Sequence, residues 1–258
     1  DADRDLTSLV YSGLLKGTPT GTFVPDLAET FTVSPDGLTY TFVISKNAVF
    51  HDGTPVTADD VKFTVEKAQE SALKSPRRVN WEGVTIKKAE DRTIVFSLKQ
   101  PYAPFISNLT LGIVPKHLWS SLESDQIPFS ALNVNPIGSG PYRVSKVVRS
   151  NDGIPNEVIL RANTKYTKGK PHIQTLDFKF FTNEKLLVTA LQDGVVESAS
   201  NLTPTGATTV KEITPIVYAP LTRVFGVFFN QNENEVLAHK EVRKALELSI
   251  QKEFIIQN

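Results

Sequence analysis

The sequence contains no cysteine, which excludes disulfides, thiolate nucleophiles and cysteine-based metal sites. No run of apolar residues approaches the eighteen or so that a membrane-spanning helix needs, so we expect no span in this chain. Neither sign of charge is in excess, because 28 basic residues balance 28 acidic ones without a block of five like charges. This balance argues against a nucleic-acid surface and against a polybasic membrane anchor.

Methionine is also absent, and the chain opens on Asp1. We therefore expect that the chain is not a primary translation product, and that any signal sequence was removed before residue 1. The lack of cysteine is compatible with an oxidising compartment outside the cytoplasm.

What is present is a mixture of hairpin and helix patterns, in a chain long enough for one large domain or two small ones. Apolar residues at helical spacing predict helices at 3–15, 57–70, 102–109, 115–122, 183–192 and 242–256. Alternating apolar and polar residues predict strands at 29–33, 38–45, 83–88, 93–98, 141–149, 156–162, 174–181, 195–199, 214–218 and 222–230. This mixture predicts an α/β (mixed α+β) fold, with a loop at 123–137.

The most informative stretch is residues 29–68, which predicts a hairpin, a second turn and a capped helix in one unbroken run. Ser34-Pro35-Asp36-Gly37 has the residues of a tight turn, because proline presets φ and glycine accepts a positive φ. Thr57 stands at the expected helix N-cap, and Asp60 follows three residues later as in a capping box.

The order of residue types in this stretch resembles the signature of the peptide/nickel solute-binding proteins of ABC transporters (the dipeptide- and oligopeptide-binding type, family 5). That signature has a DG hairpin, Tyr-x-Phe, Phe-His-Asp-Gly-Thr-Pro and Thr-Ala-x-Asp-Val. Here the matching residues are Asp36-Gly37, Tyr40 to Phe42, Phe50 to Pro55 and Thr57 to Val61.

The resemblance continues along the rest of the chain. Further family landmarks are matched by Val10 to Leu15, Asp91 to Thr93, Pro101 to Phe105, Val114 to Leu118, Gly138 to Tyr142, Phe229-Asn230 and Val242 to Leu246. One segment departs from the pattern: Gly194 to Glu197 stands where the family often has Gly-Glu-(Val/Ile)-Asp, so we assign that segment no role.

The resemblance implies a periplasmic-binding-protein-like type II lobe with an inserted β-rich subdomain. Full members of the family are about twice as long and have two lobes, so we expect an N-terminal lobe fragment. Residues 1–13 with 137–230 would form the sheet framework, and 14–136 the inserted subdomain. Residues 231–258 would form the crossover and the start of the second lobe, on which the apolar face of the final helix would pack.

The function that the resemblance implies is the extracytoplasmic solute-binding component of an ABC transporter. Such a protein binds peptides or similar solutes between its lobes and delivers them to the permease. We expect a monomer in the periplasm or on the cell surface as a lipoprotein. We expect no enzymatic activity, no cofactor and no nucleic-acid partner.

Four residues are candidates for lining a ligand site. Trp81 and Asn80 follow two arginines in a polar stretch, and could offer stacking area and hydrogen-bond donors to a ligand; the alternative is a Trp that caps the subdomain core. Asp3 and Arg4 lie in the region that faces the inter-lobe cleft in the family; the alternative is a solvated helix N-terminus.

Asn230 and Asn232 are candidates for hinge residues. The resemblance places the crossover near Phe228-Phe229-Asn230, so hinge flexing should involve residues 226–236. Asparagine suits such a position because it tolerates unusual φ and ψ angles.

Three other functions remain open at this point. A metal-chelate or haem binder would need His or Met at the cleft, but the four histidines (His51, His117, His172 and His239) are widely spaced and predict no metal site. A hydrolase would use Ser139 as nucleophile, although the following Pro141 and alternating residues predict a strand rather than a nucleophile elbow. A sensing or adhesion module would use the same lobes to present a bound peptide.

Overall fold

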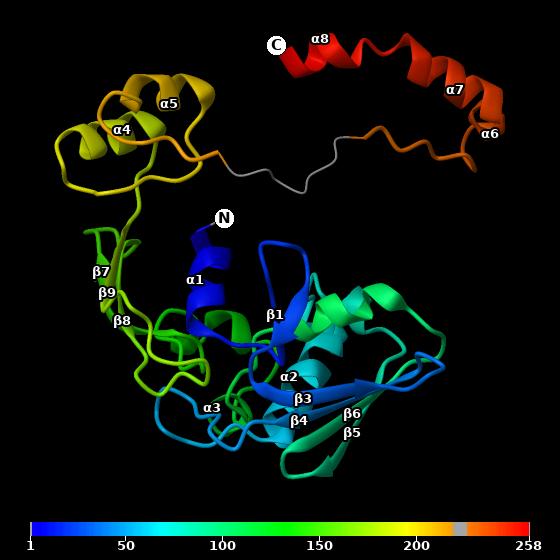
Figure 1. Cartoon of the computed structure of the whole chain (residues 1–258), viewed down its shortest axis with the longest axis vertical. Coiled ribbons are helices and arrows are strands. Elements are labelled where there is room, and N and C mark those ends of the chain that lie inside the picture. Colours follow the sequence, from blue (N-terminus) through cyan, green and yellow to red (C-terminus); the bar gives the residue numbers. More distant parts are fainter. Residues whose placement is uncertain (1, 219–225, 258) are drawn as a thin grey trace. The chain divides into compact units, whose positions relative to one another are not determined.

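The computed structural model describes residues 2–218 and 226–257, which form two compact units at residues 1–201 and 202–258. Figure 1 shows the elements of each unit. The predicted α/β class is confirmed, because helices and three antiparallel sheets alternate along the chain. The predicted division into framework, inserted subdomain and crossover stays a prediction.

The first unit contains a four-stranded antiparallel sheet in the order β3-β4-β6-β5. Its strands are β3 (Ala28–Val33), β4 (Thr39–Ile44), β5 (Thr85–Glu90) and β6 (Thr93–Ser97). Residues of β4 alternate between buried and half-buried, as period-2 geometry requires. The turn between β3 and β4 needs Gly37, whose φ is +69°.

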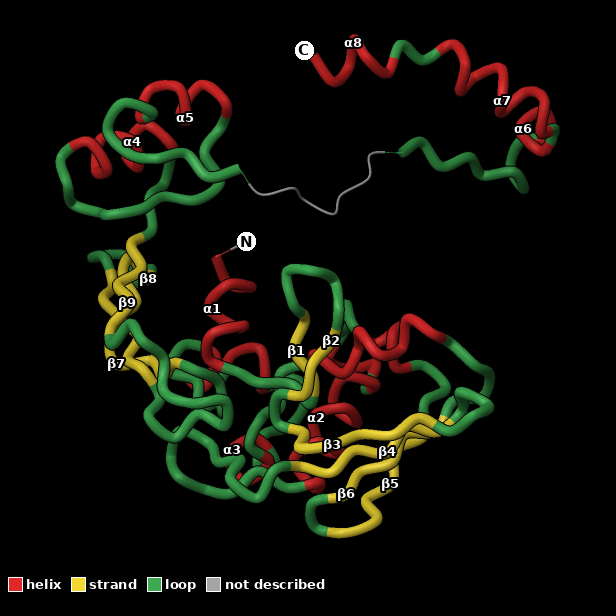
Figure 2. Tube along the Cα trace, in the orientation of Figure 1, coloured by secondary structure: helices red, strands yellow, loops and turns green. Residues whose placement is uncertain are grey.

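Helix α2 (Ala58–Gln69) packs against this sheet, as Figure 2 shows. Its predicted N-cap at Thr57 is confirmed, since the carboxylate of Asp60 accepts hydrogen bonds from the backbone N–H (2.9 Å) and the hydroxyl (2.8 Å) of Thr57. The second Asp60 oxygen accepts from the backbone N–H of Lys116 at 2.8 Å. One buried carboxylate therefore fixes the start of α2 and the start of α3 (Lys116–Trp119).

Between the sheet and the short helices lies an aromatic core. The Trp81 ring centroid lies 6.0 Å from that of Phe96 and 5.7 Å from that of Phe105, and Tyr40 packs on Phe105 at 4.9 Å. The short elements of this part of the chain are β1 (Leu15–Gly17), β2 (Phe23–Pro25) and the 3₁₀ helices η1 (Ser71–Leu73), η2 (Arg78–Trp81), η3 (Ala103–Thr110), η4 (Ile127–Phe129) and η5 (Ala131–Asn133). The hairpin of β1 and β2 was not predicted.

A second sheet in the first unit has the order β7-β8-β9, with strands β7 (Tyr142–Arg149), β8 (Pro155–Ala162) and β9 (Thr175–Lys179). Helix α1 (Ala2–Val10) contacts β7, and Val10 joins Tyr142, Val158 and Leu160 in a small core. Helix α4 (Glu184–Gln192) completes this unit. The predicted helix at 3–15 is shorter, because Gly13 packs against the backbone of Thr110 and leaves the helical path.

The chain between the two sheets passes through a segment where only glycine fits. A Cβ at Gly138 would lie 2.0 Å from the carbonyl oxygen of Val10, and one at Gly140 would lie 2.6 Å from that of Leu9. The backbone N–H of Gly140 donates to the Val10 carbonyl at 2.8 Å. This close approach joins the end of α1 to the start of β7.

The second unit contains α5 (Pro204–Val210), α6 (Glu235–Ala238), α7 (Lys240–Ser249) and α8 (Lys252–Gln257). The predicted final helix is divided at Ile250, whose backbone is extended. The predicted strands at 195–199 and 214–218 are wrong: both segments are irregular, and neither pairs with a strand in the part of the chain that the structure describes. Of the strand predicted at 222–230, residues 226–230 are irregular and 222–225 lie outside the described residues.

Candidate functional site

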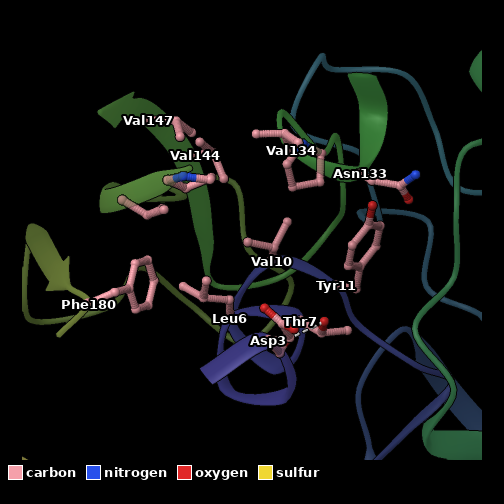
Figure 3. Close-up of a pocket in the computed structure, with 13 residues that line it drawn as sticks. Asp3, Leu6, Thr7, Val10, Tyr11, Asn133, Val134, Val144, Val147 and Phe180 are labelled. Atoms are coloured by element: carbon pink, nitrogen blue, oxygen red, sulfur yellow. Dashed lines mark hydrogen bonds between the residues drawn. The ribbon is translucent and has the colours of Figure 1, made fainter. Parts of the chain in front are cut away.

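A cavity of about 480 Å³ lies within the first unit, between α1, the β7–β8 sheet and the segment around η5. Figure 3 shows its walls, with α1 on one side and β7 on the other. The lining residues are Asp3, Leu6, Thr7, Val10, Tyr11, Asn133, Val134, Pro136, Val144, Val147, Pro155, Val158 and Phe180. Its size falls within the range of small-molecule sites.

Helix periodicity explains the α1 side of the cavity. Leu6 and Val10 are four residues apart, so both side chains lie on the same face of the helix. Asp3 and Thr7 form a parallel row beside them, which adds polar groups to this apolar face. The helix therefore presents an apolar stripe with a polar edge.

A β-bulge explains the sheet side. Val144 and Val147 both line the cavity, although residues three apart face opposite sides of a regular strand. The pairing register with β8 shifts between Val144 and Lys146, and the extra residue brings both valines to the same face. Val158 of β8 and Phe180 after β9 complete this apolar wall.

Polar groups gather along the remaining side of the cavity. The Thr7 hydroxyl donates to the backbone carbonyl of Asp3 at 2.6 Å, while the Asp3 carboxylate has no partner among the described residues. Burial raises the pKa of the Tyr11 phenol to about 12, so Tyr11 stays neutral at physiological pH. Asn133 from η5 adds an amide.

The structure separates the four lining candidates. Asp3 lines the cavity, whereas Arg4 is exposed and does not line it. The Asn80 side chain is also exposed, and its carbonyl accepts a hydrogen bond from Asn108 at 2.8 Å. Trp81 is 1% exposed in the aromatic core, so its predicted place on a ligand cleft is corrected to the core position that was the alternative.

The hinge candidates lie in a turn of the second unit. The side-chain oxygen of Asn230 accepts from the backbone N–H of Asn232 at 3.2 Å, and the Asn230 carbonyl accepts from Glu233 at 3.4 Å. This is the local bonding that asparagine supplies in turns. A hinge at this position stays a prediction.

His51 has a structural role, because it joins the segment after β4 to the Gly138–Gly140 segment that precedes β7. Its Nδ1 accepts from the backbone N–H of Gly138 at 3.2 Å, and its Nε2 donates to the carbonyl of Gly140 at 3.1 Å. A backbone N–H can only donate and a carbonyl can only accept, so this pairing requires the neutral ring with its proton on Nε2. Burial, reinforced by the charge of Arg143, lowers the pKa of His51.

Ser139 lacks the surroundings of a nucleophile. Its hydroxyl is buried, with the residue 1% exposed, and has no hydrogen-bond partner within the described part of the chain. The nearby His51 uses both ring nitrogens on the backbone of Gly138 and Gly140, so it cannot serve as the base that an activated serine requires.

In residues 2–218 and 226–257, no three His, Asp or Glu side chains lie close enough together to hold a metal ion. Each helix in these ranges is too short or too polar to cross a bilayer.

Comparison with known proteins identifies the family. The model for "Bacterial extracellular solute-binding proteins, family 5 Middle" matches residues 22–258, which is most of the chain. The chain belongs to this family. Its relatives carry the names of binding proteins rather than enzymes, which supports a binding role in general.

Two curated relatives illustrate the match. The oligopeptide-binding protein AppA of Bacillus subtilis is 28% identical over 261 residues, covering 99% of this chain and 47% of AppA. The dipeptide-binding protein of Escherichia coli K12 is 26% identical, covering 91% of this chain and 47% of that protein. The chain thus spans about half the length, or less, of the curated relatives it matches.

Solved structures share the fold. NikZ from Campylobacter jejuni, in complex with Ni(L-His), has a TM-score of 0.74 at 27% identity and covers 97% of this chain and 50% of its own. AppA from Bacillus subtilis, in complex with a nonapeptide, has a TM-score of 0.70 at 29% identity and covers 76% of this chain and 39% of its own. The predicted resemblance to the family is confirmed.

Proposed function

We propose that this chain is part of the extracytoplasmic solute-binding component of an ABC transporter, and that it binds peptides or similar small solutes for delivery to a permease. The observation that carries this proposal is the family match over residues 22–258. The geometry agrees with it, because the cavity beside α1 offers apolar walls and a few polar groups, which is the composition of a binding site.

In the proposed mechanism, the first unit supplies one wall of a two-lobed site, and a second lobe closes over the solute. Solute binding stabilises the closed form through contacts that the open form lacks, so closure is a population shift. The second unit exposes apolar side chains that a partner lobe would cover, since Leu246 and Ile250 are about two-fifths exposed. We expect a monomer that works outside the cytoplasm, in the periplasm or on the cell surface.

A metal chelate is the second candidate solute, because NikZ covers nearly the whole chain and its structure holds Ni(L-His). A chelate brings its own ligands, so it needs few metal-binding side chains from the protein. Peptide binding remains the first candidate, because AppA was solved with a nonapeptide and the cavity beside α1 is largely apolar.

Calorimetry on two proteins tests this function. We expect the 258-residue chain alone to bind a mixture of nonapeptides weakly, and a longer protein that carries both lobes to bind it with micromolar affinity or better. Titration with Ni(L-His) in parallel separates the two candidates. Micromolar peptide affinity in the 258-residue chain alone would contradict the two-lobed mechanism. Failure of the two-lobed protein to bind either nonapeptides or Ni(L-His) would contradict the function. Mass spectrometry of solutes that copurify with the longer protein would then name the ligand.

A further inference from the structure

The cavity beside α1 is an unusual mixture of apolar area and a single charge. Nine of its thirteen lining residues are apolar, and they come from α1, β7, β8 and the segments after η5 and β9. Such walls favour a ligand with a stretch of methylene groups, each of which strengthens binding about fourfold when it leaves water.

Asp3 carries the charge. Among the lining residues it is the one carboxylate, no Lys, Arg or His lines the cavity, and the Tyr11 pKa of about 12 keeps that phenol neutral. The Asp3 carboxylate has no partner among the described residues. It is therefore available to a ligand, and it attracts a cation and repels an anion.

A place in the first turn of α1 does not by itself explain why Asp3 lines the cavity. A carboxylate in the first helical turn is stabilised by the helix dipole, and Asp5 shares that turn. Asp5 does not line the cavity, whereas Asp3 does, together with Thr7 on the same helix face and Tyr11 just after the helix. The two aspartates thus differ in their access to the cavity, which makes Asp5 a matched control.

We propose that this cavity is a subsite for a side chain with an aliphatic stem and a positively charged end, with the stem on the valine-rich walls and the charge at Asp3. Lysine and arginine side chains of a peptide have this chemistry, since their stems cover apolar surface while their charged ends stay near water. The assignment rests on the proposed function, because it treats the cavity as part of the solute-binding surface. It favours basic peptides over acidic solutes.

Small probes test the subsite without knowledge of the full solute. Binding of hexylamine, hexan-1-ol and hexanoate to the protein is measured by NMR titration. Methylamine, which carries the charge but no aliphatic stem, is the control for the charge alone. We expect hexylamine to bind up to about fivefold more tightly than hexan-1-ol, which is the usual limit for an exposed ion pair. Hexanoate should bind most weakly of the three six-carbon probes, and the shifted amides should lie in α1 and β7.

Two variants complete the test. In Asp3→Asn, hexylamine and hexan-1-ol should bind within twofold of each other, while Asp5→Asn should keep the wild-type preference. Hexanoate binding as tightly as hexylamine, an unchanged preference in Asp3→Asn, or an equal loss in both variants would overturn the subsite. Amide chemical-shift changes that lie outside α1 and β7 would overturn it as well.

The proposed function and the subsite fail in different ways. A two-lobed protein that binds no solute but keeps the Asp3-dependent amine preference would overturn the function and support the cation subsite. A protein that binds peptides but shows no preference for lysine over norleucine at any position, and no amine preference, would support the function and overturn the subsite.

Discussion

The two larger sheets of the first unit, of four and three strands, differ in how they are packed. The four-stranded region encloses one cluster of twenty buried apolar residues between Leu14 and Ile113, with aromatic rings at its centre. The three-stranded region, α1 with β7–β9, buries only four residues in its cluster and leaves a cavity beside them. The four-stranded region is thus densely packed, whereas the sparser packing of the three-stranded region leaves a cavity.

The largest effect is expected from the aromatic core. Trp81→Ala should lower the free energy of unfolding by about 3–5 kcal/mol, because it leaves a cavity among Phe96 and Phe105. Val79→Ala, two residues away and 73% exposed, should change it by less than about 0.5 kcal/mol. Urea denaturation measures both, and a loss below 1 kcal/mol for Trp81→Ala would mean that the two regions do not differ in packing as described.

The second effect concerns the junction between the regions. Gly138→Ala should lower the free energy of unfolding by about 1–3 kcal/mol, because the added methyl group collides with the Val10 carbonyl. Since Val10 lines the cavity, hexylamine binding should weaken as well. Gly17→Ala is the control, because a Cβ added at Gly17 would lie 3.9 Å from its nearest neighbouring atom, which is an ordinary contact distance. Equal stability of the two variants would show that α1 is not held at Gly138.

The third effect is a pH dependence at the same junction. The pKa of His51 is lowered in the folded protein, mainly by burial, so the unfolded chain takes up the proton first as the pH falls. The contribution to stability is complete above the unfolded pKa of about 6.5, and it is lost as the pH falls towards the folded pKa. The slope cannot exceed about 1.4 kcal/mol per pH unit for one proton.

Unfolding curves between pH 8 and pH 5 measure this loss. His51→Asn should be less stable than the wild type at pH 8, and the difference should shrink as the pH falls. His172→Asn is the control, because His172 is exposed and should leave the curve unchanged. A difference between wild type and His51→Asn that is constant over this range would rule out the neutral-ring contact with Gly138.

The smallest effect on stability is expected at Asp3. Asp3→Asn removes a favourable interaction with the dipole of α1, which is worth about 0.3–1 kcal/mol. The same change should abolish the preference for hexylamine. Thermal unfolding and the NMR titration together check this, and a variant that loses stability without losing the preference would make Asp3 a helix residue only.

Much of the four-stranded region could be predicted because its signals are local. The turn at Ser34 to Gly37 and the cap formed by Thr57 and Asp60 depend on neighbouring residues, and both were confirmed. The hairpin of β1 and β2 was missed because its strands have three residues each, too few to show alternation.

The cavity could be predicted only in part. Helical spacing predicted a helix at 3–15, which supplies one wall, but the bulge after Val144 depends on pairing with β8 and leaves no signal in the sequence. At Trp81 the sequence did give a signal, but it pointed to the cleft as readily as to the core. Its polar neighbours suggested exposure, whereas the 3₁₀ turn of η2 directs its ring into the core.

The most direct test of this account is amide hydrogen exchange with and without a millimolar mixture of nonapeptides. Slower exchange should be confined to α1 and the strands β7 and β8, while the four-stranded region should exchange at the same rate in both samples. Slowing in the four-stranded region with none in α1 would contradict the claim that the sparsely packed region is the wall that meets the solute.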